Sequence, residues 1–357
     1  MTPAGPSPAG AGPILVWGTG AIGGTVAAYL ARAGLHVHAV DSDEAHVAAV
    51  RRDGLRITGP IESFSQPLPI DPPESVTGTW GTVFLCTKAL HTRAAATALL
   101  PHLASDGVVV SLQNGLNELT IAEVAGRERT LGAFVNFGAD RLEPGVVHFG
   151  GRGAVVVGEL DGRPSARLDS VLAALRRFEP DAVASDNIWG YLWGKMGYGA
   201  LLFAGALTDA SIVETLEADD VRGVMTELAR EVMRVAAAEG VTPMGFNGYD
   251  PAAFLPGGTD AAVAASFVAM ADFNHRSAKT HSGVWRDIAV HGRQTETDAQ
   301  FGPVLAVAHR RGVAVPALRR MVARMHEVES RQRPLAWDNL ASLAEPGEEG
   351  ARHAHPL

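Results

Sequence analysis

The feature that most constrains the fold of this chain is a short apolar run that leads directly into three glycines. Ile14–Trp17 is followed by Gly18, Gly20 and Gly23 in the spacing G-x-G-x-x-G. A helical pattern follows the glycines, and a second apolar run covers His36–Val40. Strand, glycine turn, helix and strand in this order predict a βαβ unit that binds a dinucleotide. The glycines allow a tight turn, close approach of the phosphates and close packing of the helix on the strand.

The residues expected to form the phosphate-binding loop are Gly18, Thr19, Gly20, Ala21, Ile22 and Gly23. Asp41 ends the second apolar run, where a carboxylate can accept hydrogen bonds from the adenosine ribose. Because a 2′-phosphate would meet like charge there, Asp41 favours NAD over NADP. Arg51 and Arg52 lie close in the sequence, so NADP stays open if an arginine turns toward the site. The structural alternative for Asp41 is capping of the helix that begins near Glu44.

Strand and helix signals alternate through the first half of the chain. Apolar runs of strand length lie at Val83–Cys86, Val108–Leu112 and Gly132–Phe137, with helical patterns between them. This alternation predicts an α/β fold with a parallel sheet covered on both faces. Lys88 follows the first of these runs and Asn114 the second, so both are expected at the carboxyl edge of the sheet, where ligands bind. An ordinary turn is the alternative for Asn114, which precedes a glycine.

Other segments of the first half predict a smaller β excursion. Leu55–Gly59 and Phe64–Ile70 are expected to form an antiparallel pair between the second helix and the next parallel strand. Val146–Phe149 and Ala154–Gly158 continue as strands, and Pro164–Phe178 fits a helix.

The composition changes near residue 187, after which long helical patterns replace the strand signals. The expected helices are Ile188–Phe203, Val221–Glu239, Asp260–Ala271, Gly302–Gly312 and Pro316–Arg331. We therefore predict a dinucleotide-binding domain over 13–187 and an all-helical domain for substrate binding and dimerisation over 188–335. The flanking segments, 1–12 and 345–357, are predicted to be disordered because their composition cannot build a core.

The overall composition narrows the class of protein. Hydrophobic residues make up 46% of the chain and charged residues 19%, which is typical of a globular protein. The net charge of −9 argues against a nucleic-acid partner, which normally requires a basic face. No apolar stretch reaches transmembrane length, and a single cysteine, Cys86, fits a reducing compartment. We expect a cytoplasmic protein with no membrane partner, and no ligand spacing indicates a metal site.

In order and spacing, these motifs resemble the ketopantoate reductase family over nearly the whole chain. The resemblance is carried by the Gly18–Gly23 loop, Thr87-Lys88-Ala89, Gln113-Asn114-Gly115, Trp193-Gly194-Lys195 and the run from Gly292 to Asp298. It implies a Rossmann domain, a helical C-terminal domain and a cleft between them. It also implies reduction of a 2-oxo acid to a 2-hydroxy acid with a nicotinamide cofactor, and a homodimer.

The resemblance assigns roles to four residues. Lys195 matches the lysine that acts as general acid, Glu296 the glutamate near substrate and lysine, and Asn114 the asparagine near the nicotinamide. Ser282 matches, within one residue, a serine that holds the substrate carboxylate. The chemistry needs such a lysine, because hydride attack on a ketone builds negative charge on oxygen. The structural alternatives are a surface lysine at Lys195 and a helix-start carboxylate at Glu296.

Two positions depart from the family pattern. Gly199 and Phe203 stand where ketopantoate enzymes carry asparagines that contact substrate, four and eight residues after the lysine. A phenyl ring cannot replace the hydrogen bonds of an asparagine, so we expect a divergent member with a bulkier or more apolar substrate than ketopantoate. His281 or Arg286 is expected to supply polar contacts in their place, Arg286 being suited to a carboxylate. An ion pair of Arg286 with the next residue is the alternative.

The sequence therefore predicts an NAD(P)-dependent oxidoreductase acting on the CH–OH group of donors. Its substrate is expected to be a small-molecule compound, either a 2-oxo or 2-hydroxy acid or a related carbonyl compound. A non-catalytic sensor that binds a nicotinamide dinucleotide, and a reductase of another carbonyl or imine, are the alternatives.

Overall fold

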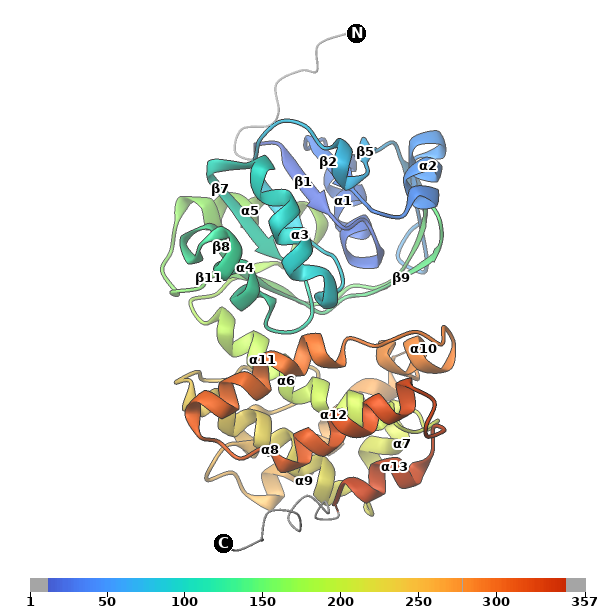
Figure 1. Ribbon diagram of the computed structural model, residues 1–357, viewed down its shortest axis with the longest axis vertical. Helices are drawn as coiled ribbons and strands as arrows, with labels where there is room; N and C mark the ends of the chain where they lie inside the picture. The colour runs from blue at the N-terminus through green and yellow to red at the C-terminus, as the bar shows by residue number, and fades with distance from the viewer. Residues whose placement is uncertain (1–11, 278, 345–357) are drawn as a thin grey trace, which may run out of the picture. The chain divides into compact units, whose positions relative to one another are not determined.

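The computed structural model describes residues 12–277 and 279–344, and the chain divides into two units after Trp189 (Figure 1). The division lies close to the boundary expected near residue 187. The segments predicted to be disordered, 1–12 and 345–357, fall outside the described residues except for Gly12.

The first unit is built on a largely parallel eight-stranded sheet, as the alternating pattern predicted. Its strands, in the order in which they pair, are β12 (Val183–Ala184), β11 (Val155–Glu159), β8 (Thr130–Val135), β7 (Leu103–Ser111), β6 (Trp80–Leu85), β1 (Ile14–Trp17), β2 (Val37–Val40) and β5 (Ile70–Asp71). Only the β11–β8 pair in this sheet is antiparallel. The strand order reverses around β1, which makes the loops after β1 and β6 a site for a ligand.

Helices cover both faces of this sheet because the strands are apolar on both sides. The helices are α1 (Ala21–Arg32), α2 (Glu44–Asp53), α3 (Thr92–Leu99), α4 (Asn117–Ala125) and α5 (Ala166–Phe178). Ile14 and Val16 pack in a core with α1 and α5, whereas Leu15 and Trp17 pack in a second core with α3 and α4. Alternate residues of one buried strand therefore belong to different cores, as expected for a central strand.

A second, four-stranded sheet corrects part of the prediction. Its order is β4 (Phe64–Gln66), β3 (Leu55–Thr58), β10 (Val146–Gly151) and β9 (Gly138–Glu143). The pair β3–β4 is antiparallel, but the strand expected over Phe64–Ile70 is divided. Pro67 and Pro69 interrupt it, and the chain then joins the main sheet as β5. Strand β9 was not predicted, because its residues are mostly polar and exposed.

The second unit is helical, with bounds that differ in places from the prediction. Its helices are α6 (Ile188–Gly205), α7 (Ile212–Glu217), α8 (Arg222–Ala238), α9 (Asp260–His275), α10 (Gly283–Ala289), α11 (Thr297–Arg311), α12 (Pro316–Glu329) and α13 (Trp337–Ala341). Helix α11 begins before the expected Gly302 and carries Pro303 inside it. Helical structure also continues to Ala344, beyond the end expected at residue 335.

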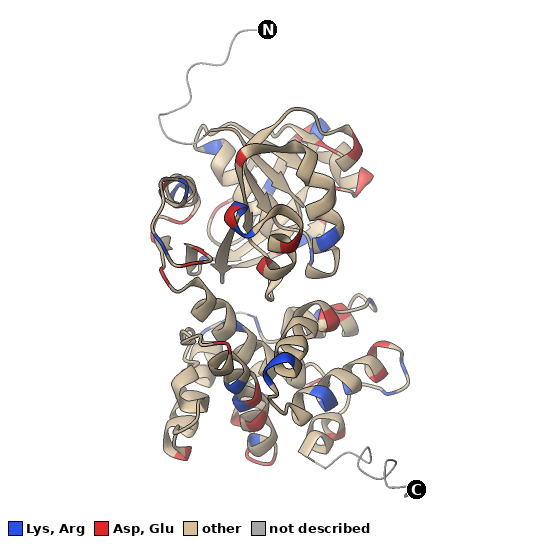
Figure 2. Cartoon of the chain, turned by 60° about the vertical axis from the view of Figure 1, so that its left-hand side comes forward, with Lys and Arg blue, Asp and Glu red and all other residues tan. Residues whose placement is uncertain are grey.

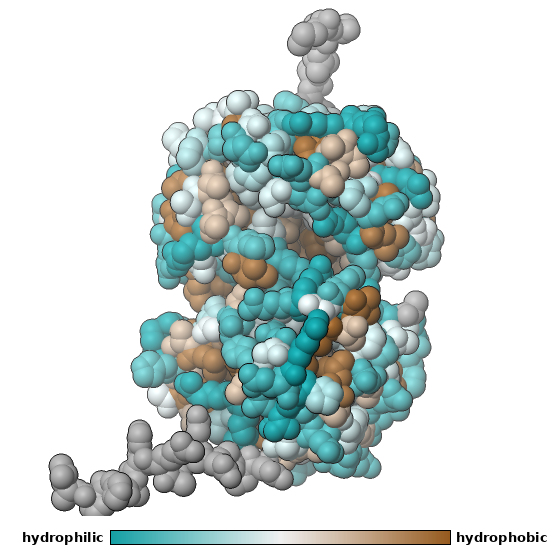
Figure 3. Space-filling view, turned by 45° about the vertical axis from the view of Figure 1, so that its right-hand side comes forward, coloured by the Kyte–Doolittle hydropathy of each residue, from teal (hydrophilic) through white to brown (hydrophobic). Residues whose placement is uncertain are grey.

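Charged and apolar side chains are mixed over the surface. Figure 2 shows basic and acidic residues interspersed along both units. Several of their side chains form ion pairs, such as Arg167 with Glu159 at 2.6 Å. The face in Figure 3 is mostly hydrophilic with small apolar patches. Among the described residues, no helix combines the length and apolar character needed to cross a bilayer.

Candidate active site

Four parallel strands of the first unit end in register at one edge of the sheet. Trp17 of β1 pairs with Val40 of β2 and with Leu85 of β6, and Leu85 pairs in turn with Ser111 of β7. The loops that leave these strand ends carry the predicted cofactor and substrate residues Gly18–Gly23, Asp41, Lys88 and Asn114. The topology therefore brings these residues to the carboxyl edge at the point where strand order reverses, which is the expected ligand-binding position.

The three loop glycines differ in what surrounds them. Gly18 has φ +94°, and a Cβ there would lie 2.7 Å from the backbone nitrogen of Thr87. A Cβ on Gly23 would lie closer than 3.0 Å to the carbonyl oxygen of Gly18 and to Cys86. Gly20 has nothing within 4 Å of such an atom. Two glycines therefore allow the turn and the helix packing, while the third leaves its backbone open to a ligand.

The start of α1 is suited to an anion. Gly20 is its N-cap residue and provides no side-chain hydrogen bond, and the first turn holds no acidic residue. Ala21 and Ile22 lie in that turn and are partly exposed. Unsatisfied N–H groups at the positive end of a helix dipole bind phosphate groups. The predicted cofactor residues thus form a backbone cradle for a pyrophosphate.

Asp41 is bonded to the glycine loop. Its carboxylate accepts hydrogen bonds from the backbone N–H of Thr19 at 2.8 Å and from that of Asp43 at 3.0 Å. Thr19 is fully buried, and its hydroxyl donates to the carbonyl oxygen of Val40 at 2.9 Å. The cap of α2 is Asp43, which accepts from the His46 N–H at 3.1 Å, so capping of α2 by Asp41 is not what the structure shows.

The arginine at this corner is one that the sequence analysis missed. Arg51 and Arg52 each pair with an acidic residue of their own surroundings. Arg141, from β9, lies 2.9 Å from the carboxylate of Asp43. The hydrogen bond from the His46 backbone, together with Arg141, holds the pKa of Asp43 below its usual value against the opposing effect of burial. Only the unpredicted strand β9 brings Arg141 here, so no local pattern could have identified it.

A buried polar network holds the loops that carry Lys88 and Asn114. The Nε2 of Gln113 donates to the carbonyl oxygen of Thr87 and to the hydroxyl of Thr92, both at 2.8 Å. The Thr92 hydroxyl lies 2.9 Å from Oδ1 of Asn117. The Nδ2 of Asn117 donates to the carbonyl oxygen of Asn114 at 2.6 Å. The Asn114 side chain is exposed and Lys88 is partly exposed, so both stand on a fixed backbone at the sheet edge.

In the second unit, helix α6 carries Lys195 on a position fixed by close backbone packing. A Cβ on Gly194 would lie closer than 3.0 Å to the carbonyl oxygen of Met244, and one on Gly197 equally close to the hydroxyl of Tyr249. The Met244 N–H also donates to the carbonyl oxygen of Gly190 at 2.9 Å. The segment around Met244 and Tyr249 therefore seats one side of α6, and Lys195, which is partly exposed, emerges beside it.

The two positions that depart from the family pattern have different surroundings. Gly199 is partly exposed, with nothing within 4 Å of a Cβ built on it. Phe203 is 2% exposed, and its ring packs edge-on against Phe301 with centroids 4.9 Å apart. The structure thus places Phe203 in the helical core, whereas Gly199 lies on an open part of α6.

Glu296 stands at the N-cap position of α11, between two buried threonines. The backbone N–H of Thr295 donates to Glu329 at 2.9 Å, and its hydroxyl also bonds that carboxylate. The hydroxyls of Thr295 and Thr297 are 2.6 Å apart. These contacts fix the backbone on both sides of Glu296, and the sequence analysis did not identify Glu329.

Ser282 and its neighbours form the start of α10. The Ser282 hydroxyl accepts from the backbone N–H of Trp285 at 3.1 Å, which makes Ser282 the helix cap. His281 stacks on Trp285 with ring centroids 4.0 Å apart. Arg286 is partly exposed on the same helix, and Asp287 pairs with Arg293 at 2.6 Å.

The described residues indicate neither a cysteine nucleophile nor a metal centre. Burial raises the pKa of the Cys86 thiol well above neutrality, so this side chain is not a ready nucleophile. Within residues 12–277 and 279–344, no group of three or more His, Cys, Asp or Glu side chains is placed to hold a metal ion.

Comparison with known families gives matches in both units. Residues 14–162 match the family described as "Ketopantoate reductase PanE/ApbA". Residues 187–329 match the family described as "Ketopantoate reductase PanE/ApbA C terminal". The chain is 30% identical over 315 residues to the 2-dehydropantoate 2-reductase of Halobacterium salinarum, which covers 86% of this chain and 95% of that one.

Solved structures have the same fold over most of the chain. A PanE/ApbA family ketopantoate reductase from Ralstonia eutropha JMP134 is 26% identical, with a TM-score of 0.75, and the match covers 90% of this chain and 99% of that one. D-mandelate dehydrogenase in complex with NADH and anilino(oxo)acetate is 21% identical, with a TM-score of 0.78 and the same two coverages.

Proposed function

Because this chain belongs to the ketopantoate reductase family, we propose that it is an NAD(P)-dependent oxidoreductase that interconverts a 2-oxo acid, or a related ketone, and a 2-hydroxy acid. The observation that carries the proposal is the backbone cradle at Gly20, which opens at the switch point of the sheet beside Asp41, Lys88 and Asn114. The family relation supplies the reaction class.

The residues present fit a nicotinamide dinucleotide. The uncapped start of α1 would bind the pyrophosphate, and Asp41 would accept hydrogen bonds from the ribose of the adenosine half. The cofactor, when bound, supplies or accepts a hydride. We propose NAD as the preferred form, because Asp41 and Asp43 place two carboxylates where a 2′-phosphate would lie. The positive charge of Arg141 would partly offset the repulsion between these carboxylates and a 2′-phosphate, so NADP would still bind, but more weakly than NAD.

Cofactor choice can be tested at Asp41. Asp41→Asn removes the negative charge and keeps one oxygen that can accept from the Thr19 N–H. The Asp43 N–H loses its acceptor in this variant. We expect the preference for NADH over NADPH to fall about tenfold, equivalent to about 1.4 kcal/mol. Fluorescence titration with both cofactors measures it, and Asp106→Asn, at an exposed position of β7, is the matched control. An unchanged preference would remove Asp41 from cofactor selection.

Lys195 is the proposed general acid. In the reductive direction its ammonium donates a proton to the substrate oxygen, on which negative charge develops as the carbonyl carbon is reduced. Glu296 would orient Lys195 and the substrate, and the Asn114 amide would donate to the substrate. Ser282 and Arg286 would bind the carboxylate. The fixed backbones on both sides of Glu296 and along α6 support such positioning.

Substitution of Lys195 tests the mechanism. Lys195→Met should lower kcat by about 100- to 10,000-fold, the usual contribution of a general acid, while NADH affinity stays the same. Lys195→Arg keeps the charge but donates a proton poorly, so it should recover binding of the substrate but not turnover. Full turnover by Lys195→Met on a substrate of the wild-type protein would overturn this role.

The substrate is proposed to differ from ketopantoate. Gly199 and Phe203 lack the hydrogen-bonding groups expected at these positions, and Phe203 lies in the core. The loss of these groups also motivates the second candidate, a non-catalytic sensor of the nicotinamide cofactor. Absorbance at 340 nm with a panel of oxo acids, ketones and imines separates the two. The homodimer and the cytoplasmic location stay predictions, and sedimentation analysis tests the first.

A further inference from the structure

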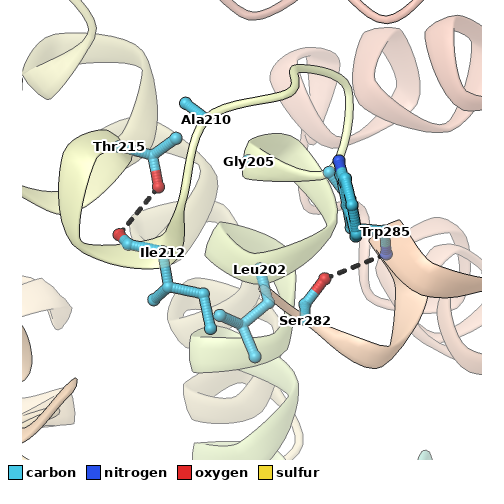
Figure 4. A pocket seen from close by; sticks show the side chains of 8 residues that line it. Leu202, Gly205, Ala210, Ile212, Thr215, Ser282 and Trp285 are labelled. Atoms are coloured by element: carbon cyan, nitrogen blue, oxygen red, sulfur yellow. Dashed lines mark hydrogen bonds between the residues drawn. The ribbon is translucent and has the colours of Figure 1, made fainter. Parts of the chain in front are cut away.

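The small cavity of the helical unit has room for about one water molecule. It lies between α6, α7 and α10, and Leu202, Ile212 and Trp285 are among the residues that line it (Figure 4). A cavity of this size holds neither a substrate nor a cofactor. An unassigned contact with a ligand is indicated instead in the sheet unit, at the hairpin formed by β9 and β10.

The turn of this hairpin is fastened to α2 by a buried histidine. Nδ1 of His46 accepts a hydrogen bond from the backbone N–H of Gly145 at 3.0 Å. The carbonyl oxygen of Gly145 accepts from the backbone N–H of Arg56 at 2.9 Å. Gly145 has φ +78°, and a Cβ on it would lie 3.0 Å from the Cβ of Ala49 in α2. Both backbone groups of the turn glycine are therefore bonded, and His46 provides the bond to α2.

Burial keeps His46 neutral, which its role as an acceptor requires. The side chain is 0% exposed. Burial is the main effect that lowers the pKa of His46, and Arg141 acts in the same direction, against Asp41, Asp43 and the backbone of Thr19. In the neutral ring the proton is on Nε2, which is buried without a hydrogen-bond acceptor among the described residues. The bond through Nδ1 is therefore what the ring contributes to the turn.

The same hairpin carries Arg141 beside a β-bulge. The register of β9 against β10 shifts after Arg141, which leaves Leu142 as the extra residue. Bulges re-aim side chains next to functional sites. The guanidinium of Arg141 lies 2.9 Å from Oδ2 of Asp43, and the side chain is 37% exposed. Because a guanidinium has five N–H donors, Arg141 can hold Asp43 and still bind a ligand.

Arg141 stands next to the proposed ribose site. Asp43 donates its backbone N–H to Asp41 at 3.0 Å, and Asp41 is the residue proposed to meet the adenosine ribose. A 2′-phosphate is attached to that ribose, and an arginine near the acidic residue accommodates it in proteins that bind NADP. Arginine suits this task because its planar guanidinium matches a phosphate group with two parallel N–H bonds.

We propose that His46 is a positioning residue for cofactor recognition: it holds the β9–β10 hairpin against α2 and thereby keeps Arg141 where the 2′-phosphate of NADPH would lie. This inference rests on the proposed function, since it takes Asp41 as the residue that meets the ribose. NADH lacks the 2′-phosphate, so its affinity does not depend on the hairpin. His46 and Arg141 together set how well NADPH can replace NADH.

Substitution of Arg141 tests the phosphate contact by binding, independently of turnover. Fluorescence titration of the full-length protein with NADH and NADPH gives the ratio of the two affinities. Arg141→Met should weaken NADPH by at least about tenfold and leave NADH unchanged. Arg163→Met is the matched control, because Arg163 is exposed, pairs with Asp161 and follows β11, which β8, β7 and β6 separate from β1. Equal NADPH affinity of the wild type and Arg141→Met would overturn the proposal.

Variants of His46 test the positioning role. His46→Phe keeps a ring but removes the acceptor for Gly145, so it should weaken NADPH about as much as Arg141→Met does, with NADH unchanged. His46→Gln, whose amide matches Nε2 rather than Nδ1, should behave in the same way if the phenylalanine variant is unstable. His46→Asn places an oxygen near the position of Nδ1 and should restore the wild-type ratio.

The ratio distinguishes positioning from a merely structural role, which would weaken both cofactors equally. Adding Arg141→Met to His46→Phe should cause little further loss of NADPH affinity, because both changes remove the same contact. Fully additive losses, or an equal loss of NADH and NADPH in His46→Phe, would contradict the role of His46.

Turnover separates failure of this inference from failure of the proposed function. If the ratios change as expected but no oxo acid is reduced at 340 nm, the role of His46 stands and the reductase function fails. If an oxo acid is reduced and the variants leave the ratio unchanged, the function stands and this inference fails. If the wild type binds neither dinucleotide, both fail.

Discussion

Both units of this protein contain a pair of glycines whose surroundings are opposite. In the sheet unit a Cβ on Gly23 would lie within 3.0 Å of a backbone oxygen, whereas Gly20 has nothing within 4 Å. In the helical unit the same contrast separates Gly194 from Gly199. Gly23 and Gly194 are required by the chain's own packing. Gly20 and Gly199 leave open space. Gly20 lies where we propose that the pyrophosphate binds, and Gly199 lies one turn after the proposed catalytic lysine.

Among these four glycines, the largest effect is expected at Gly194. Gly194→Ala forces the new methyl group against the carbonyl oxygen of Met244. Because this oxygen belongs to the backbone, the clash is relieved only if the whole segment around Met244 moves. Overpacking of this kind destabilises a protein by about 1–3 kcal/mol. Urea unfolding should show a lower midpoint, and Lys195 should lose its position on α6, so kcat should fall as well. Wild-type stability in this variant would mean that the segment around Met244 does not fix the helix.

Gly20→Ala should leave the fold intact and weaken the binding of the cofactor. The backbone at Gly20 has a negative φ of −69°, so it does not lie in the left-handed region that requires glycine, and the added methyl group meets no protein atom. It does occupy the space through which the pyrophosphate approaches the backbone. We expect NADH to bind about 10- to 100-fold more weakly, or about 1.4–2.7 kcal/mol. Fluorescence titration measures this, and unaltered affinity with an unaltered melting curve would place the pyrophosphate elsewhere.

The sheet unit could be predicted well because its signals are local. The glycine spacing, the apolar runs and the acid at the end of the second run all lie within a short stretch, and parallel pairing carries their ends to one edge. Prediction was wrong where local signals were misleading. Two prolines divided the strand expected over Phe64–Ile70, and β9 was missed because its exposed, polar residues carry little strand signal.

Site residues that depend on distant contacts could not be predicted from the sequence. Arg141 reaches Asp43 from β9, and Glu329 bonds Thr295 from the end of α12. The difference between Gly194 and Gly199 also depends on a distant contact, because the segment at Met244 packs against Gly194 and not against Gly199. In the sequence both are helical glycines near Lys195. Their roles follow from tertiary contacts that no spacing encodes.

The smallest expected effect is at Gly199, and its sign is the sharpest test of the comparison. Gly199→Ala adds a methyl group that meets nothing, on a helix where glycine is unfavourable relative to alanine. The variant should therefore be more stable than wild type by about 0.5–1 kcal/mol, in contrast to Gly194→Ala on the same helix. Urea unfolding of both variants measures the difference. Equal destabilisation by the two would show that α6 is packed on both sides and that Gly199 does not face open space.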